Sequence, residues 1–392
     1  MIPFPDVDVN QVFYIQEAGI DESIRGNEAT FPDAFEKLIV NLNDRRTSSR
    51  YGGQRPISIP MDNVIHQTAT SALITIPKDL TPELDMLLPR FLVPVQISLE
   101  SSAIPVPAES ISRVQTWLNA IEFNADILAI VNSLSEQGLK DDIRYLSGED
   151  ANSEIISRHS FASGSRIASK WIKTHFEESG LQCEFQDFLI GFAPNVVCGY
   201  EALSNISETI LRAPGADDDG SGTIALLEMA RAIKNNGVTF ESNVKFVTFA
   251  GEEQGLLGSR AYAKSLKEQN VDVALMIQAD MLGFHSPDEP AQLGYTPSVG
   301  TIEVAYLIKN ISVLYAPELK VGSTQACCSD HQSFHEQGYA AMQIFERAGP
   351  IIDPMYHNSG DLSDREGYDF KQIRSIAKVN LAVALHTAGY HW

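Results

Sequence analysis

The sequence predicts an α/β fold in which a mixed, largely parallel sheet is covered by helices on both faces. Short apolar runs at 244–250, 273–279 and 341–345 have the composition of strands that are buried on both sides. Stretches with apolar residues at helical spacing, at 163–179 and 222–235, alternate with these runs along the chain. Strands that alternate with helices form a parallel or mixed sheet between two layers of helices.

The remaining elements extend this pattern toward both ends of the chain. Residues 183–190 predict a short strand, and residues 368–388 predict a C-terminal helix. Before residue 100 the sequence predicts irregular structure, apart from one strand in RFLVPVQISLE. Pro105 and Pro107 follow that strand and predict a linker. We therefore expect an N-terminal accessory or propeptide-like region at 1–108 and a main domain at 109–392.

Composition excludes several classes of function. The 392 residues carry 29 Lys and Arg against 51 Asp and Glu, a formal net charge of −22. Binding to nucleic acid or to an anionic membrane surface requires basic patches, so neither partner is expected. No apolar run is long enough to predict a transmembrane helix. The first residues also lack the basic and apolar segments of a signal peptide.

The four cysteines give a weak indication of an oxidising compartment. A bond between Cys183 and Cys198 is one possibility for these residues. Cys327 and Cys328 are adjacent, and neighbouring cysteines are not expected to bond to each other. No CxxC pair is present, so a structural zinc knuckle is not expected.

Acidic residues collect where predicted strands end or a helix begins. The positions concerned are Asp217, Asp218 and Asp219 ahead of a helix, Glu252 and Glu253 after a strand, Asp280 after the next strand, and His357 with Asp361 in a late loop. Ligands in such sheets bind outside the carboxyl ends of the strands. Converging buried carboxylates repel one another unless a cation neutralises them, and an Asp, Glu and His set suits zinc. In this arrangement Asp361 is expected to orient a metal-bound imidazole of His357.

Simpler interpretations exist for each of these residues. Three aspartates before a helix serve equally well as a helix N-cap. A histidine in a loop is more often a surface residue than a ligand, and Asp280 alone fits a turn. His331 and His335 have helical spacing but lack the HExxH glutamate, so they rank below His357 as ligands.

The ordered motifs PGADDDGSG, GEEQGLLGS, QADM, CSDHQSF and YHNSGD resemble the co-catalytic zinc aminopeptidases of the bacterial leucyl aminopeptidase type. The upstream stretches YLSGED, SRHSFASGSRIASKWI and APNVVCG are similar to that family as well, so the resemblance covers about residues 130–390. It implies a three-layer zinc-exopeptidase fold, a peptide substrate with a free N-terminus, and two zinc ions. Extracellular location is also implied by the resemblance.

The resemblance assigns a role to each motif residue. Asp218 would bridge the two zinc ions, and its bond to Asp219 would be a cis peptide. Glu253 and His357 would complete one zinc site, and Asp280 would bind the other zinc. Glu252 would be the general base that takes a proton from the attacking water.

One expected segment is missing. The family has a central strand and a His-x-Asp-Ser segment between the NVVCG stretch and the Asp-rich loop, whereas residues 199–216 contain no histidine. Residues 206–212 are the candidate for a substitute strand. Two carboxylates without an imidazole make a weak zinc site, so we expect one zinc and impaired activity.

Three functions follow from these observations. The first is a zinc-dependent aminopeptidase with impaired activity. The second is a single-zinc acyltransferase similar to glutaminyl cyclases, and the third is a non-catalytic family member. The intact pair Glu252 and Glu253 argues against the third. The preferred N-terminal residue and the oligomeric state do not follow from the sequence.

Overall fold

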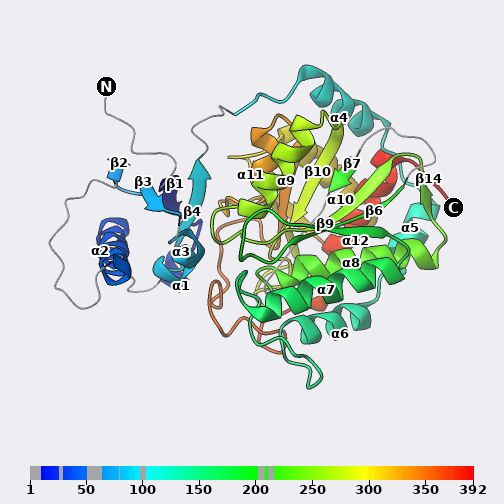
Figure 1. Cartoon of the computed structure of the whole chain (residues 1–392). Coiled ribbons are helices and arrows are strands. Elements are labelled where there is room, and N and C mark those ends of the chain that lie inside the picture. Colours follow the sequence, from blue (N-terminus) through cyan, green and yellow to red (C-terminus); the bar gives the residue numbers. More distant parts are fainter. Residues whose placement is uncertain are drawn as a thin grey trace.

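The computed structural model describes residues 10–25, 30–50, 64–78, 80–97, 103–201, 208–210 and 216–392. In these residues the chain forms a four-stranded sheet near the N-terminus and an eight-stranded sheet in the remainder (Figure 1). A further pair of short strands, β8 (Thr239–Phe240) and β14 (Tyr390–His391), joins the C-terminus to the larger part.

The eight-stranded sheet is mixed, as the sequence predicts. Its strands are β5 (Gln182–Gln186), β6 (Asn195–Tyr200), β7 (Glu208–Ile210), β9 (Asn243–Thr248), β10 (Val273–Ala279), β11 (Gln292–Tyr295), β12 (Lys320–Ser323) and β13 (Ala341–Phe345). Their order is β12-β11-β13-β10-β7-β9-β6-β5. The central pairs that involve β13, β10, β7 and β9 are parallel, while β11 with β13, β6 with β9, and β5 with β6 are antiparallel.

Helices cover both faces of this sheet, so the predicted α/β fold class is confirmed (Figure 1). They are α4 (Ala108–Ala120), α5 (Ala125–Asn132), α6 (Glu136–Leu146), α7 (Ser163–Glu178), α8 (Gly220–Asn235), α9 (Leu257–Glu268), α10 (Ile302–Tyr315), α11 (His331–Glu336) and α12 (Phe370–Ala388). Helix α12 contacts both α8 and α10, with α4, α5 and α6 packed against these three, whereas α9 and α11 pack together beside β10 and β13. Every residue of β10 and β13 is buried, which explains why both are apolar except for Gln278 and Gln343.

The predicted elements of the main sheet agree with the structure within a few residues. The runs at 273–279 and 341–345 are β10 and β13 without any shift. The predicted strand at 183–190 is too long, because β5 ends at Gln186 and the following residues turn back toward β6. The predicted helices at 163–179, 222–235 and 368–388 are α7, α8 and α12.

The expectation that the first hundred residues are largely irregular is wrong. They contain β1 (Asn10–Glu17), α1 (Glu22–Arg25), α2 (Phe31–Arg50), β2 (Val64–Gln67), β3 (Ser71–Pro77), a 3-10 turn at Thr81–Glu83, α3 (Leu84–Leu87) and β4 (Leu92–Ile97). The sheet order is β2-β3-β1-β4, and β1 pairs antiparallel with both neighbours. Its core includes Phe13, Ile15, Ile74 and Ile76, which alternate along their strands. Because β1 and β3 lie far apart in the sequence, no local turn signal indicates that they pair.

A short substitute strand occupies the centre of the large sheet. Strand β7 lies between β9 and β10, within the segment 206–212 that the sequence offers for this role. It is only three residues long, and the neighbouring residues 202–207 and 211–215 lie outside the described part of the chain. The described helices include none long and apolar enough to cross a membrane.

Candidate metal and catalytic site

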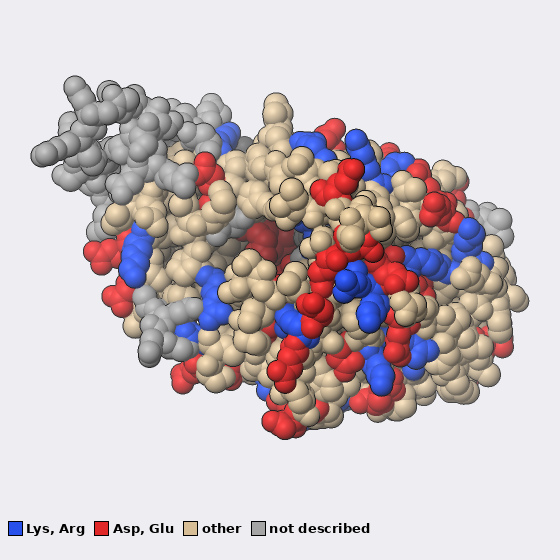
Figure 2. All heavy atoms as spheres, turned by 90° about the horizontal axis from the view of Figure 1, so that it is seen from below, with Lys and Arg blue, Asp and Glu red and all other residues tan. Residues whose placement is uncertain are grey.

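The residues singled out in the sequence meet at the carboxyl end of the large sheet. Asp218 precedes α8, Glu252 and Glu253 follow β9, and Asp280 follows β10. His357 comes from the loop after β13. A small cavity of about 40 Å³ is lined by all five of these side chains. Figure 2 shows acidic side chains set deep in a hollow of the molecular surface.

Three of the five form a compact donor group. Nε2 of His357 lies 3.2 Å from Oδ2 of Asp218 and 3.2 Å from Oε2 of Glu253. One ligand atom from each residue lies within 4.8 Å of the other two. Two carboxylates and one imidazole are a donor set that suits a divalent transition metal such as zinc. Asp280 lines the same cavity but is not part of this close group.

The pKa shifts of Asp218 and His357 indicate that the carboxylates of the group repel one another. Burial and the nearby Glu253 raise the pKa of Asp218 well above its usual value, although His357 acts in the opposite direction. Burial disfavours the charged form of His357, but Glu253 and Asp218 outweigh it and raise the pKa of that imidazole. Both shifts express carboxylates held close together out of water. A bound cation would relieve this repulsion, so the residues fit the metal that the family resemblance implies.

Local backbone conformation fixes the loops of the site. Among the described residues, the non-glycine positions with positive φ are Leu256, Asn270, Met281 and His357. His357 is itself a metal-ligand candidate, Met281 follows Asp280, and Leu256 lies three residues after Glu253. Such backbone conformations cluster at functional sites. The peptide bond between Asp218 and Asp219 is cis, as the resemblance implies.

Asp219 serves as the N-cap of α8, in agreement with the simpler interpretation of the aspartate run. Its Oδ1 accepts hydrogen bonds from the backbone N–H of Gly222 at 2.9 Å and of Met281 at 3.2 Å. The second bond ties the start of α8 to the residue after Asp280. Asp219 therefore connects the two loops that carry Asp218 and Asp280.

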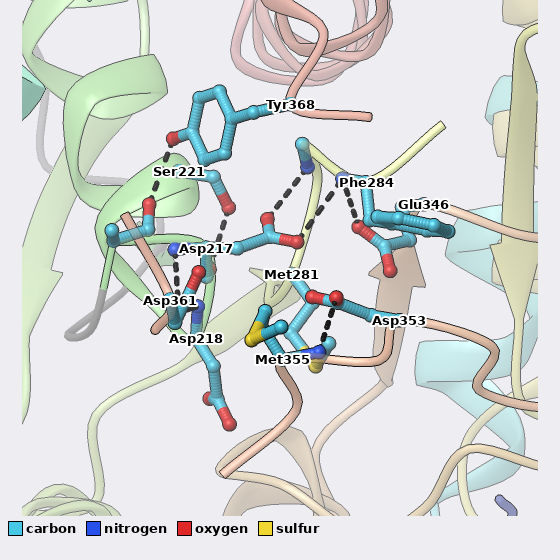
Figure 3. Close-up of polar contacts among 12 residues, drawn as sticks. Asp217, Asp218, Ser221, Met281, Phe284, Glu346, Asp353, Met355, Asp361 and Tyr368 are labelled. Carbon is cyan, nitrogen blue, oxygen red and sulfur yellow. Dashed lines mark hydrogen bonds between the residues drawn. The ribbon is translucent and has the colours of Figure 1, made fainter. Parts of the chain in front are cut away.

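The expectation that Asp361 orients the imidazole of His357 is wrong. Its Oδ2 accepts hydrogen bonds from the backbone N–H of Asp217 at 2.9 Å and of Asp218 at 3.1 Å, and its Oδ1 accepts one from Arg365 at 3.0 Å (Figure 3). These bonds show that the carboxylate positions the backbone that carries Asp218.

A second cluster of carboxylates lies behind the site and was not predicted from the sequence. Asp217, Glu346 and Asp353 are almost completely buried. The side chain of Asp218 points away from them (Figure 3). Arg365 lies 2.5 Å from Oδ2 of Asp353 and 3.6 Å from Oδ2 of Asp217, so the protein supplies this cluster with its own cation.

This cluster holds the loop after β10. Asp217 accepts hydrogen bonds from the backbone N–H of Gly283 and Phe284, and Glu346 accepts one from Phe284. Burial, then Asp361 and Asp353, raise the pKa of Asp217 to about 7. Glu346 directly follows the apolar run at 341–345. An acidic residue after a predicted strand is the signal that indicated Glu252, and the same signal is present at Glu346.

His331 and His335 flank the site without joining the donor group. Nδ1 of His331 lies 3.0 Å from Oε1 of Gln278, and Nε2 of Gln278 donates to Oδ2 of Asp280 at 3.0 Å. Gln278 was not selected from the sequence, because an amide inside an apolar strand gives no metal-site signal. The lower rank of His331 and His335 as ligands agrees with this geometry.

Both cysteine pairs are joined in the structure. The bond between Cys183 and Cys198 links β5 to β6, where the two residues face each other. The expectation that Cys327 and Cys328 stay unbonded is wrong, because a cis peptide brings their Cα atoms to 3.0 Å and their sulfurs together. Both residues of this second pair line the small cavity.

The chain is an α/β protein with a candidate metal site, and several known proteins are similar to it. Residues 200–384 match the model of Peptidase family M28. Leucine aminopeptidase 1 of Neurospora crassa is 36% identical over 197 residues, which are 46% of this chain and 46% of that protein. A probable leucine aminopeptidase of Arthroderma otae is 27% identical over 274 residues, 64% of this chain and 72% of that protein.

Solved structures share the fold. The LapA aminopeptidase of Legionella pneumophila superposes with a TM-score of 0.67 at 17% identity, over 97% of this chain and 98% of that one. The glutaminyl cyclase of Fimbriiglobus ruber superposes with a TM-score of 0.54 at 16% identity, over 64% of this chain and 95% of that one. The match to LapA includes most of the N-terminal region.

The predicted resemblance to this aminopeptidase family is therefore confirmed by the match of residues 200–384 to the family model and by the curated leucine aminopeptidases. The chain spans about half the length of the Neurospora crassa relative.

Proposed function

We propose that this protein is a zinc-dependent aminopeptidase that removes N-terminal residues from peptides with a free N-terminus. The observation that carries the proposal is the convergence of Asp218, Glu253 and His357, whose ligand atoms lie within 4.8 Å of one another. The names of the curated relatives support the same activity. When bound, zinc supplies Lewis-acid polarisation of the scissile carbonyl.

Glu252 is the proposed general base. Its side chain lines the small cavity together with the donor group, and it is not one of the three donors. A partly exposed carboxylate next to the metal ligands can accept the proton of an attacking water and return it to the leaving amine. Apolar residues of the same cavity, including Met281 and Phe345, suit an apolar N-terminal side chain of the substrate.

We propose a stoichiometry of one zinc and a reduced turnover. Asp280 is directed by a hydrogen bond from Gln278 and lies outside the close donor group. Without the histidine that the family places in the missing segment, Asp218 and Asp280 are left as the ligands of a second ion. Two carboxylates hold zinc weakly.

A single-zinc acyltransferase is the second candidate. One Asp, one Glu and one His form the donor group, which favours it, and a glutaminyl cyclase shares the fold. The longer match to the aminopeptidase LapA favours the first candidate. A non-catalytic role is the third, and the geometry of the donor group argues against it.

The test combines zinc content with two assays. Dialysed wild-type protein should retain about one zinc per chain, because three protein ligands are the usual number at catalytic zinc sites. It should release leucine from leucyl peptides and should not cyclise N-terminal glutamine. His357→Ala should lose the zinc. Release of pyroglutamate without leucine release would select the acyltransferase, and neither product at full zinc content would contradict catalysis.

Glu252→Gln separates catalysis from metal binding. We expect it to keep the zinc and to lose about 10²–10⁴-fold in kcat, which is the usual contribution of a general base. Glu268→Gln, at an exposed position at the end of α9, is the matched control and should behave like the wild type. Unchanged kcat in Glu252→Gln would exclude its role as the base.

We further propose an extracellular location and a boundary between residues 108 and 109. The disulfides Cys183–Cys198 and Cys327–Cys328 support the location, because disulfides persist in oxidising compartments. The separate sheet and core of the N-terminal residues support the boundary.

A further inference from the structure

The described residues of β7 pair with only part of the neighbouring strands beside the site. On β9 it pairs with Asn243 and Val244, and on β10 it pairs with residues from Val273 to Met276. Strand β9 continues to Thr248, and no described residue pairs with this last part on the β7 side. A buried cavity of about 50 Å³ lies here, lined by Thr223, Thr248 and residues of α7.

Arg158 is common to this small cavity and to the cavity of the candidate site. Its side chain lines the buried cavity and also a larger one of about 390 Å³, which contains Asp218, Glu252 and Glu253. The larger cavity reaches the molecular surface, because the fully exposed Ile156 is part of its lining. Arg158 is partly buried, so it belongs to the wall of the site cavity.

The charge of Arg158 is directed toward the carboxylates of the site. Asp361, Asp219 and Asp218 favour its charged form, while burial lowers its pKa from the usual arginine value. An arginine keeps its charge at neutral pH even when partly desolvated. No hydrogen bond or ion pair joins its guanidinium to another residue in the described part of the chain. Its donors are therefore available to a ligand in the cavity.

We propose that Arg158 is a further catalytic residue, which donates a hydrogen bond to the carbonyl oxygen of the scissile peptide bond. The inference rests on the proposed aminopeptidase function. Water oxygen forms a bond to the carbonyl carbon, Glu252 takes the water proton, and the carbonyl oxygen becomes negative. Arg158 stabilises that oxygen. The C–N bond then breaks, and Glu252 transfers the proton to the leaving amine nitrogen.

A positive donor is needed at this place because the walls of the cavity are acidic. Asp218, Glu252, Glu253 and Asp361 all line it, and a negative oxygen would be repelled by them. Among the described residues of the lining, Arg158 and His159 carry the basic side chains. In the proposed one-zinc site, the guanidinium supplies positive charge. In the two-zinc arrangement that the resemblance implies, the second zinc would supply it.

Arg158→Met tests the proposal, with Arg158→Lys as the conservative variant. We expect kcat for a leucyl dipeptide to fall about 100-fold in Arg158→Met, with KM and zinc content unchanged, as when an oxyanion donor is removed. Arg158→Lys should recover part of the loss, and guanidinium ions should restore part of the activity of Arg158→Ala. Arg113→Met, which removes a surface arginine paired with Asp272, is the matched control.

A second readout does not depend on turnover. A phosphinic dipeptide analogue carries an anionic oxygen in place of the attacked carbonyl, and calorimetry should give an affinity about 100-fold lower for Arg158→Met than for the wild type. Equal affinity and equal kcat would overturn the inference while leaving the proposed function intact. A loss confined to KM for a free dipeptide, absent for its C-terminal amide, would assign Arg158 to the substrate carboxylate and overturn it as well. A wild type that holds zinc but hydrolyses nothing would contradict the proposed function, and the analogue titration would still decide the role of Arg158.

Discussion

His331 reaches the candidate site through one intervening amide. It is buried, and its imidazole meets Gln278, which in turn donates to Asp280. Burial, with a smaller contribution from His335, lowers the pKa of His331 to about 3. The imidazole is therefore neutral at neutral pH and holds the amide of Gln278 in the orientation that presents its N–H to Asp280.

This buried histidine should make stability depend on pH. Between the unfolded pKa of 6.5 and the folded pKa of about 3, the unfolded chain binds a proton that the folded chain does not. Its contribution is complete above 6.5 and is lost as the pH falls, by up to about 1.4 kcal/mol per pH unit. Urea unfolding at about pH 7 and about pH 5 should show a smaller decrease for His331→Gln than for the wild type. The same decrease in both proteins would contradict the assignment, and His391→Gln is an exposed control.

The sequence indicates the donor residues better than the residues that position them. Asp218, Glu253 and His357 follow from acids and a histidine placed after strands and in a late loop, and the structure brings these three together. The partners of Asp361 could not be predicted, because they are backbone N–H groups whose direction depends on the turn before α8. Arg158 gave no signal, because a cavity wall is assembled from distant segments.

Strand β7, described over three residues, lies between β9 and β10 in the large sheet. Its three residues have strands on both sides, so their backbone groups are paired although the strand is short. Edge strands tolerate missing hydrogen bonds, whereas a central strand does not. The stability of the sheet therefore depends on a few backbone hydrogen bonds next to the candidate site.

A proline substitution in the middle of β7 should show how far the stability of the sheet depends on the backbone hydrogen bonds of this strand. Thr209→Pro removes a backbone donor between β9 and β10, and a buried partner left without its hydrogen bond costs about 1–3 kcal/mol. Thr209→Val keeps the backbone and should stay close to the wild type in the free energy of unfolding. Chemical denaturation measures both variants. Equal stability of the two would mean that β7 does not contribute to the sheet.

At the level of elements, strands that are buried on both faces could be predicted and the N-terminal sheet could not. Strand β10 is recognisable because all of its residues except Gln278 are apolar. Strands β1 and β3 are interrupted by polar residues, and their pairing partner lies more than fifty residues away. The local sequence pattern does not predict such strand pairing, because tertiary contacts determine which strands pair.

At the scale of the whole molecule, the N-terminal sheet forms part of the wall of the site. Val93 and Pro94 of β4 line the small cavity with the donor group. Nε2 of Gln16 donates to Sγ of Cys328 at 3.5 Å. In Figure 1, β4 is the strand of the N-terminal sheet that stands next to the larger part. Access of a substrate therefore depends on both parts of the chain.

Gly255 offers a test of this contact. It has φ of +110°, and an added Cβ would lie 2.8 Å from the ring of Phe13 and 3.2 Å from the backbone nitrogen of Gln96. Gly255→Ala should therefore push β1 and β4 away from the loop after Glu253 and make the N-terminal region more sensitive to limited proteolysis. Gly237→Ala also has positive φ but meets no atom within 4 Å, so it controls for backbone strain. Equal cleavage of the two variants would argue against a close contact.

The loop that carries His357 is fastened to the start of the chain. The backbone N–H of Ile351 donates to the carbonyl oxygen of Gly19 at 2.7 Å, and Asp21 donates back to Ile351 at 2.8 Å. Arg90 also donates to the carbonyl oxygen of Pro354. During evolution, a change in either of these two segments is therefore constrained by its contacts with the other. A recombinant that joined this loop to the N-terminal region of a distant relative would hold His357 in the same position only if that region made the same contacts to Ile351 and Pro354.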